Sequence, residues 1–161
     1  MAGLGYAGIQ KKKAAEAASA KATTEADDSN TVTWQGKTYK YNQNLSNYLL
    51  LGVDKRTPAE TRVGKADAGQ ADALFLLSLN RKTKEMTLIS IPRDTMTDVE
   101  SFDLEGKSLG KSKDHISLSY GYGDGGAESC KLTQEAVSNL FYGLPIQGYL
   151  AMNLDGIPEL T

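Results

Sequence analysis

The sequence has little cysteine or histidine and no long apolar run. Cys130 is the only cysteine and His115 the only histidine in 161 residues. The chain alone therefore cannot form an intramolecular disulfide, a cysteine-rich metal cluster or a multi-histidine zinc site. No apolar stretch approaches the roughly 20 residues that cross a bilayer. Basic charge is not in excess either, since 18 Lys and Arg face 20 Asp and Glu, so nothing points to nucleic acid and any anion site must be local.

Length and composition indicate one folded domain that follows a polar segment. The hydrophobic content of 40% is enough for one core. Residues 11–30 are mostly Lys, Ala, Glu, Ser, Thr and Asp, and they bury too little surface to offset the entropy cost of ordering. We interpret residues 1–30 as a membrane-proximal linker or frayed helix, with a solvated alanine-rich helix as the alternative. Residues 4–9 are a candidate for the end of a membrane helix, and residues 31–161 form the domain.

The apolar pattern predicts an α/β fold with a mixed central sheet. The continuous apolar run at 48–53 is typical of a strand buried on both faces, and a second run covers 73–79. A polar turn joins that second strand to a third at 86–91, so these two strands are antiparallel neighbours. A further strand is expected at 149–153. Apolar residues at helical spacing predict a helix over 127–142.

The remaining segments read as connections. Residues 31–42 alternate around a Gln-Gly pair and predict a small β-hairpin. Residues 95–113 are rich in Asp, Ser, Gly and Lys and predict a long irregular segment. Residues 156–160 read as a helix start that includes a first-turn proline. Because no compact domain would naturally end one turn into an element, we expect more chain after Thr161.

Charged residues gather where an α/β sheet places its ligands, at or near strand ends. They are Asp54 with Lys55 and Arg56, Asp72, and Arg93 with Asp94. Carboxylates beside arginines fit a divalent cation that bridges phosphate oxygens, because Mg²⁺ prefers oxygen ligands and guanidinium binds phosphate with two donors. The alternative is ordinary, since an aspartate after a strand often caps a turn.

A second group of candidates lies between residues 115 and 126. His115 is a candidate acid, base or polar contact, and the alternative is a histidine packed beside the sheet. The pair Tyr120 and Tyr122 could line a lipid or sugar groove, although alternating aromatics usually serve strand packing. The glycine-rich run at 121–126 matches neither phosphate-loop pattern, so we interpret it as a flexible turn.

Several motifs follow one another in a specific order. They are NYLLLGVDKR at 47–56, ADALFLLSLN at 71–80, SIPRDT at 90–95, HISLSYGYG at 115–123 and YLAMNLDGI at 149–157. Their order and spacing resemble the LytR-CpsA-Psr (LCP) family, over about residues 47–161.

The resemblance implies a fold, a reaction and a location. The fold is an α-β-α domain, here the N-terminal part of a catalytic domain, with a hydrophobic groove for a polyprenyl chain and its pyrophosphate at the strand ends. The reaction is the Mg²⁺-dependent transfer of a polyprenyl-pyrophosphate-linked teichoic acid or capsular polysaccharide to peptidoglycan. It takes place outside a membrane to which an N-terminal helix anchors the full-length protein.

The resemblance also assigns roles to residues. Asp54 and Asp72 match acidic positions near the metal and the pyrophosphate, and Arg93 matches a phosphate-binding arginine, so these residues are the expected catalytic group. Arg56 matches a commonly basic substrate-binding position. Asp94 is expected to orient its neighbouring arginine.

Two departures from the family pattern lead to alternatives. His115 stands where members commonly have lysine, and a second arginine-rich stretch would lie beyond Thr161, so this chain alone is expected to be inactive. An oligomer, a second chain or truncation would each explain the missing stretch. A non-catalytic protein that holds the lipid-linked polymer is the alternative function, and a cytosolic α/β metal phosphatase is a third.

A last expectation concerns the sheet itself. If later helices are missing, one face of a sheet built from the strands near Leu49, Leu74, Leu88 and Leu150 should expose apolar surface. Each exposed large aliphatic side chain forgoes roughly 1.5 to 3 kcal/mol of burial. We therefore expect stable folding only when a second polypeptide, the missing half or a long-chain lipid covers that face.

Overall fold

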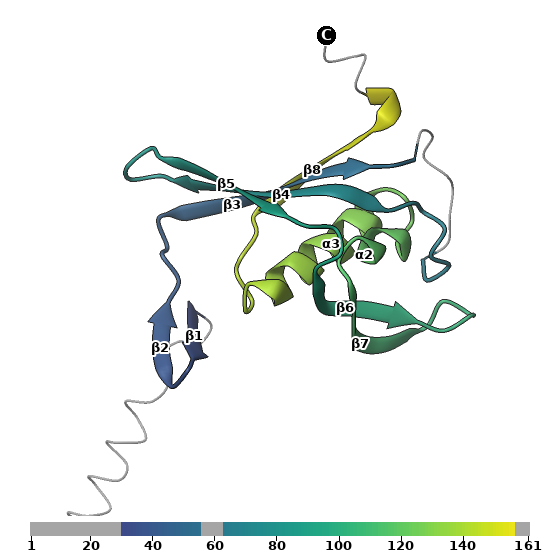
Figure 1. Cartoon of the computed structure of the whole chain (residues 1–161), viewed down its shortest axis with the longest axis horizontal. Coiled ribbons are helices and arrows are strands. Elements are labelled where there is room, and N and C mark those ends of the chain that lie inside the picture. The colour runs from purple at the N-terminus through teal and green to yellow at the C-terminus, as the bar shows by residue number, and fades with distance from the viewer. Residues whose placement is uncertain (1–29, 56–62, 157–161) are drawn as a thin grey trace, which may run out of the picture. The chain divides into compact units, whose positions relative to one another are not determined.

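The computed structural model describes residues 30–55 and 63–156 (Figure 1). Backbone contacts divide the chain into two units, Met1–Tyr41 and Asn42–Thr161. The linker predicted at residues 1–30 lies almost entirely outside the described residues. Arg56, a predicted substrate-binding residue, also falls outside them, and so does the helix start expected at residues 156–160 apart from its first residue.

The described part of the first unit is the predicted β-hairpin. Strand β1 (Thr31–Trp34) pairs antiparallel with β2 (Lys37–Lys40). The two turn residues, Gln35 and Gly36, have φ angles of 48° and 72°. A two-residue hairpin turn of type I′ requires positive φ at both positions, and glycine adopts it without steric cost. The Gln-Gly pair therefore fixes this turn, and the hairpin prediction is confirmed.

The second unit is built on a four-stranded mixed sheet in the order β5-β4-β3-β8. Its strands are β3 (Leu45–Val53), β4 (Ala71–Asn80), β5 (Met86–Ile91) and β8 (Gly148–Asn153). β4 runs antiparallel to both β3 and β5, whereas β8 runs parallel to β3. All four predicted strands and the mixed character of the sheet are confirmed.

Two helices cover one face of this sheet. α3 (Ala127–Leu140) confirms the predicted helix, and α2 (Leu118–Gly121) is a single turn that precedes it. Gly143 has a φ of 88° shortly after α3, as a helix-ending glycine should. The core lies between sheet and helices and contains Leu49, Leu51, Leu74, Leu76, Ile91, Val99, Ile116, Ala136 and Val137. In Figure 1 both helices lie on the same side of the sheet.

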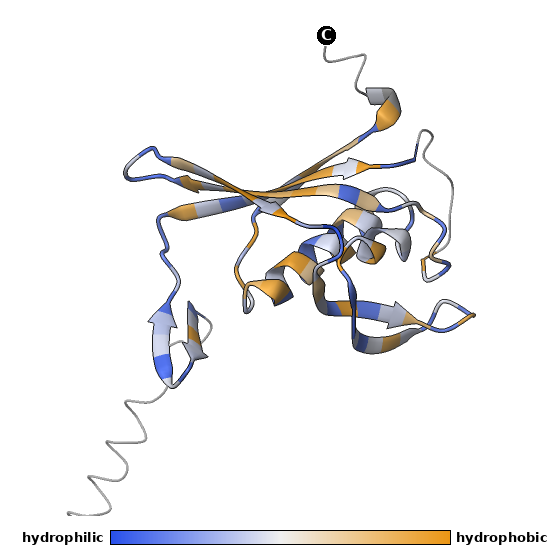
Figure 2. Ribbon diagram, in the orientation of Figure 1, coloured by the Kyte–Doolittle hydropathy of each residue, from blue (hydrophilic) through white to orange (hydrophobic). Residues whose placement is uncertain are grey.

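The other face of the sheet is covered by no helix of the described residues. Burial alternates along β3, so the expectation that this strand is buried on both faces is wrong for the described part of the chain. Leu88 and Leu150, from the two edge strands, are 58% and 66% exposed, and Figure 2 shows apolar residues along all four strands. The expected open apolar face is therefore present.

The segment predicted to be irregular forms a second hairpin instead. β6 (Met96–Phe102) pairs antiparallel with β7 (Ser108–His115). Asp103 produces the turn, because its Oδ1 accepts the backbone N–H groups of Glu105 at 3.0 Å and Lys107 at 2.8 Å. The Asp and Gly residues that indicated a loop thus form the turn, while the flanking strands pack through few buried side chains such as Val99. This correction places His115 at the end of a strand.

Candidate functional site

The candidate site lies where β3 and β5 end and β4 begins. Asp54 follows the last residue of β3, and Arg93 follows β5 after one proline. The β3–β4 register shifts at this point, because Gly52 pairs with Ala73 and Val53 pairs with Ala71. Asp72 is therefore an extra residue, a β-bulge, and such residues often re-aim a side chain beside a functional site.

Asp54 binds the turn that precedes β4. Its Oδ1 accepts the backbone N–H of Gln70 at 2.8 Å, and its own N–H donates to the Gln70 carbonyl at 3.1 Å. Gly69, with a φ of 94°, lies so close that a Cβ there would be 2.9 Å from Asp54 Oδ1. The turn-capping alternative for Asp54 is thus present, while Asp54 Oδ2 has no hydrogen-bond partner among the described residues.

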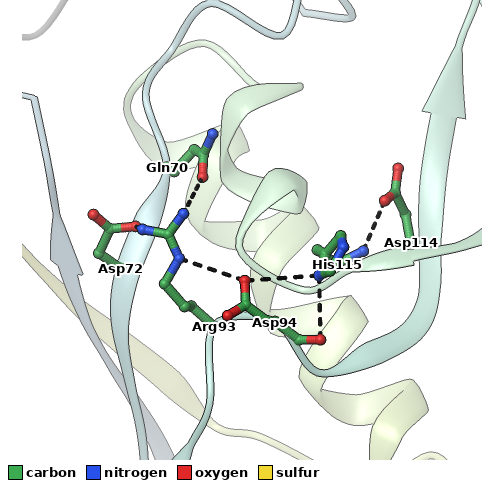
Figure 3. Close-up of polar contacts among 6 residues, drawn as sticks. All are labelled: Gln70, Asp72, Arg93, Asp94, Asp114 and His115. Carbon is green, nitrogen blue, oxygen red and sulfur yellow. Dashed lines mark hydrogen bonds and ion pairs between the residues drawn. The ribbon is translucent and has the colours of Figure 1, made fainter.

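Arg93 is held by three acceptors at the edge of the sheet (Figure 3). One terminal nitrogen forms an ion pair with Asp72 Oδ1. The other donates to Gln70 Oε1 at 3.2 Å, and Nε lies 3.6 Å from Asp94 Oδ1. Each terminal nitrogen keeps a second N–H for a ligand. The Arg93 side chain remains 46% exposed, so an anion from solvent can reach it.

Asp54 and Asp72 line the same depression. It has a volume of about 410 Å³ and is lined by Gly52, Val53, Asp54, Asp72, Ala73, Met152, Asn153 and Leu154. Its lining is mostly apolar, and within the described part of the chain the two aspartates are its only acidic residues. The structure therefore brings the two predicted metal ligands to one place.

The acidic residues present fit only one kind of metal site. In residues 30–55 and 63–156 no group of three or more His, Cys, Asp and Glu side chains could hold a metal ion. Mg²⁺ is commonly held by one or two carboxylates together with substrate phosphates and water. Asp54 and Asp72 fit that arrangement, in which the substrate supplies the remaining oxygen ligands.

His115 joins the same cluster through Asp94. Its Nδ1 lies 3.2 Å from the Asp94 carbonyl oxygen and 3.8 Å from Asp94 Oδ1. Figure 3 shows Asp94 between the imidazole and the Arg93 side chain. The predicted residues Asp72, Arg93, Asp94 and His115 therefore form one chain of polar contacts.

Tyr120 lies elsewhere. It is only 5% exposed, and its hydroxyl donates to the Gly125 carbonyl at 3.0 Å. Burial, with smaller contributions from Cys130 and Asp124, raises the pKa of Tyr120 to about 12. The ring lines a second cavity of about 490 Å³, together with Val53, Lys55, Tyr149 and other residues. The phenol thus stays protonated, and a substrate contact by Tyr120 remains a prediction.

The glycine-rich segment is a tight turn that completes the N-terminus of α3. Asp124 Oδ1 accepts the backbone N–H groups of Gly126 at 2.8 Å, Glu128 at 3.1 Å and Ser129 at 3.3 Å. Burial raises the pKa of Asp124, but these hydrogen bonds outweigh it, so the pKa is lowered overall. A carboxylate of the chain thus occupies the place that a phosphate would take, which agrees with the rejection of a phosphate loop.

Gln70 is the residue of this site that sequence reasoning missed. Its side chain accepts from Arg93 and its backbone contacts Asp54, so it connects two of the predicted residues. No charge or motif distinguishes a glutamine in a polar loop. Its position directly before the Ala-Asp-Ala stretch was the only available signal.

Comparison with known proteins gives consistent matches over most of the chain. Polyisoprenyl-teichoic acid–peptidoglycan teichoic acid transferase TagU of Bacillus licheniformis is 32% identical over 114 residues, which cover 70% of this chain and 30% of that protein. TagU of Halalkalibacterium halodurans is 32% identical over 113 residues, with the same shares of the two chains. The chain thus matches about a third of the length of these relatives.

A solved structure shows the same fold. Protein gbs0355 from Streptococcus agalactiae matches with a TM-score of 0.51 and 24% identity, over 73% of this chain and 36% of that chain. Among the helices of residues 30–55 and 63–156, none is long and apolar enough to cross a membrane. The LytR_cpsA_psr family model matches residues 6–161. The chain therefore belongs to the LytR_cpsA_psr family.

Proposed function

We propose that this chain forms the pyrophosphate-binding part of an enzyme that transfers a polyprenyl-pyrophosphate-linked glycopolymer to peptidoglycan. The family and the names of the relatives support a transferase of teichoic acid. The observation that carries the proposal is the edge of the sheet, where Asp54 and Asp72 line one depression and Arg93 is paired with Asp72. Carboxylates for a cation and a guanidinium for phosphate lie side by side there.

The proposed reaction is a phosphoryl transfer. A peptidoglycan hydroxyl attacks the phosphorus that carries the sugar, the bond to the bridging oxygen breaks, and polyprenyl phosphate leaves with the bond electrons. The hydroxyl proton passes to a base or to solvent. Arg93 compensates the charge that develops on the phosphate oxygens. A Mg²⁺ ion held by Asp54 and Asp72 would neutralise pyrophosphate charge.

The finer features of the proposal follow from the resemblance. The transferred polymer is teichoic acid, with capsular polysaccharide as the other polymer class. The polymer is linked to a membrane lipid and peptidoglycan is its acceptor, so the full-length protein acts outside the cell membrane, to which an N-terminal helix anchors it. A second chain or a C-terminal half completes the domain.

The test uses the full-length protein, a polyprenyl-pyrophosphoryl glycan as donor and peptidoglycan as acceptor, with Mg²⁺ present. Asp72→Ala should lower transfer by about a hundredfold or more, because it removes one cation ligand and the partner of Arg93. The fold should persist, since the Asp72 side chain is exposed at a bulge. Asp67→Ala, which removes an exposed carboxylate from the neighbouring loop, is the matched control. Undiminished transfer by Asp72→Ala contradicts the proposal.

A non-catalytic protein that holds the same polymer is the second candidate. It is favoured by His115, which stands where members of the family commonly have lysine. Binding of the donor without any transfer product in the same assay would support it. Cleavage of small phosphomonoesters alone would instead indicate a phosphatase.

A further inference from the structure

His115 is joined to the phosphate-binding arginine by both side-chain and backbone contacts. Its ring reaches Asp94, and Asp94 reaches Arg93 Nε (Figure 3). The backbone supports this arrangement, because Ile116 N–H donates to the Thr95 carbonyl at 2.9 Å. Ser117 N–H also donates to the Arg93 carbonyl at 3.2 Å. The backbone of the arginine is thus tied to the segment that carries the histidine.

The hydrogen bond of the ring fixes its state when neutral. A carbonyl oxygen is only an acceptor, so Nδ1 must carry the proton that faces Asp94. Protonation of the ring adds a proton at Nε2 and leaves this hydrogen bond in place. The geometry of Asp94 can therefore be kept in both states, while the charge beside its carboxylate changes.

The charge of the His115 ring determines the net charge of the group that it forms with Asp72, Arg93 and Asp94, and thereby how strongly this group attracts anions. Asp72, Arg93 and Asp94 are two carboxylates and one guanidinium, and they carry one net negative charge when the histidine is neutral. A protonated His115 brings the cluster to zero. A phosphate ligand is repelled less in the second state, because the imidazolium offsets the carboxylate of Asp94.

The other charged groups near the ring do not cancel this effect. Asp114 accepts the backbone N–H of His115 at 2.8 Å and is negative like Asp94. Lys113, on the same strand, forms an ion pair with Asp98 at 3.0 Å. Arg93 lies beyond Asp94 and keeps its charge throughout the range in which a histidine titrates.

We propose that His115 is a positioning residue that holds Asp94 against Arg93 and, by its own protonation, makes the pyrophosphate affinity of this site depend on pH. The proposal rests on the proposed function, because it deepens the role of the same arginine. A histidine titrates between about pH 5 and 8. Pyrophosphate should therefore bind more tightly at the acidic end of this range.

The experiment measures the affinity of the full-length protein for inorganic pyrophosphate by calorimetry, at about pH 5.5 and about pH 8, with Mg²⁺ constant. Each affinity is divided by that of His115→Gln at the same pH, because the ionisation of pyrophosphate is common to both proteins. The ratio should be about three to ten at the lower pH and about one at the higher pH.

Further variants separate charge from structure. His115→Lys carries the charge at both pH values, so its affinity divided by that of His115→Gln should equal the low-pH ratio of the wild type at both pH values. Asp94→Asn removes one negative charge beside Arg93 at both pH values and should therefore tighten pyrophosphate binding in both states. Lys113→Gln is the matched control, since it removes a nearby cation that does not contact Asp94, and it should leave the wild-type ratio unchanged.

The outcomes distinguish this inference from the proposed function. Pyrophosphate binding with an equal ratio at both pH values, or the same change in Lys113→Gln as in His115→Gln, contradicts the role of His115 alone. A wild-type protein that binds no pyrophosphate at either pH contradicts both proposals. Circular dichroism checks that each variant is folded. If His115→Gln is unfolded, the wild type is compared with His115→Lys instead, and their affinities should be equal at the lower pH and differ at the higher pH.

Discussion

Two places in the second unit carry polar groups that could bind a phosphate. They differ in whether those groups already have hydrogen-bond partners within the protein. At the N-terminus of α3, Asp124 Oδ1 accepts three backbone N–H groups. At the strand ends, Asp54 Oδ1 accepts one backbone N–H, and Arg93 is shared between acceptors that leave it half exposed. The first place is complete without a ligand. The second keeps donors and carboxylate oxygens on the surface.

A glycine-rich segment before a helix is therefore not by itself an anion site. Before α3, Gly123 serves close packing, since a Cβ there would lie 2.3 Å from Ser129 atoms. The Asp124 carboxylate of the same turn already accepts the free N–H groups, and its negative charge interacts favourably with the helix dipole. A ligand at the N-terminus of α3 would have to displace the Asp124 carboxylate. A ligand at Arg93 could bind the remaining N–H groups without displacing a protein side chain.

The largest expected effect is on stability and concerns the turn before α3. Gly123→Ala should lower the free energy of unfolding by about 3 kcal/mol, because the new methyl group meets backbone that cannot move aside. Urea denaturation measures the change. Gly148→Ala is the control, since its Cβ would only touch the Tyr48 ring at 3.6 Å. Equal losses for the two variants would show that the α3 turn is not tightly packed.

The next largest effect is on ligand binding and concerns Arg93 at the strand ends. Arg93→Gln should weaken pyrophosphate binding about tenfold to a hundredfold, because charge-assisted hydrogen bonds are lost. Stability should change by less than about 0.5 kcal/mol, since exposed ion pairs contribute little. Arg81→Gln, at the turn after β4, removes the same charge far along the strand and should leave affinity unchanged. If Arg93→Gln binds pyrophosphate as tightly as the wild type, the strand ends are not the phosphate site that distinguishes them from the N-terminus of α3.

The smallest effect concerns the charge of Asp124. Its pKa is lowered in the folded protein, so its ionised form stabilises the fold above the unfolded-state pKa. This stabilisation is lost as pH falls through the folded-state pKa. Asp124→Asn should therefore cost about 1 kcal/mol or less at neutral pH and less still in acid. Unfolding free energies at about pH 6 and about pH 3 check the sign, and an equal cost at both would mean that the charge contributes nothing.

Much of the fold was predictable because its strands and main helix bury apolar side chains in regular patterns. The strands β3, β4, β5 and β8 and the helix α3 were all found in this way. The β6–β7 hairpin was not, because β7 presents mostly polar residues to solvent and carries almost no apolar pattern.

The sequence provided candidate residues for the site but not their geometry. Motif order identified Asp54, Asp72, Arg93 and Asp94, and the structure places them at one edge. The bulge at Asp72 and the bridging role of Gln70 depend on strand register and on loop conformation. Neither is visible in residue types, since a one-residue shift in pairing leaves the composition unchanged.

The open face of the sheet has a thermodynamic consequence. Leu88 and Leu150 remain more than half exposed on it, and whatever covers such a face binds the folded chain and not the unfolded one. Coverage by a ligand or a second copy then stabilises the folded chain by mass action, in proportion to the logarithm of the covering partner's concentration. The unfolding midpoint of residues 1–161 should accordingly rise with protein concentration or with added long-chain lipid. A midpoint that is independent of both, in a chain that light scattering shows to be monomeric, would mean that the face is stable in water.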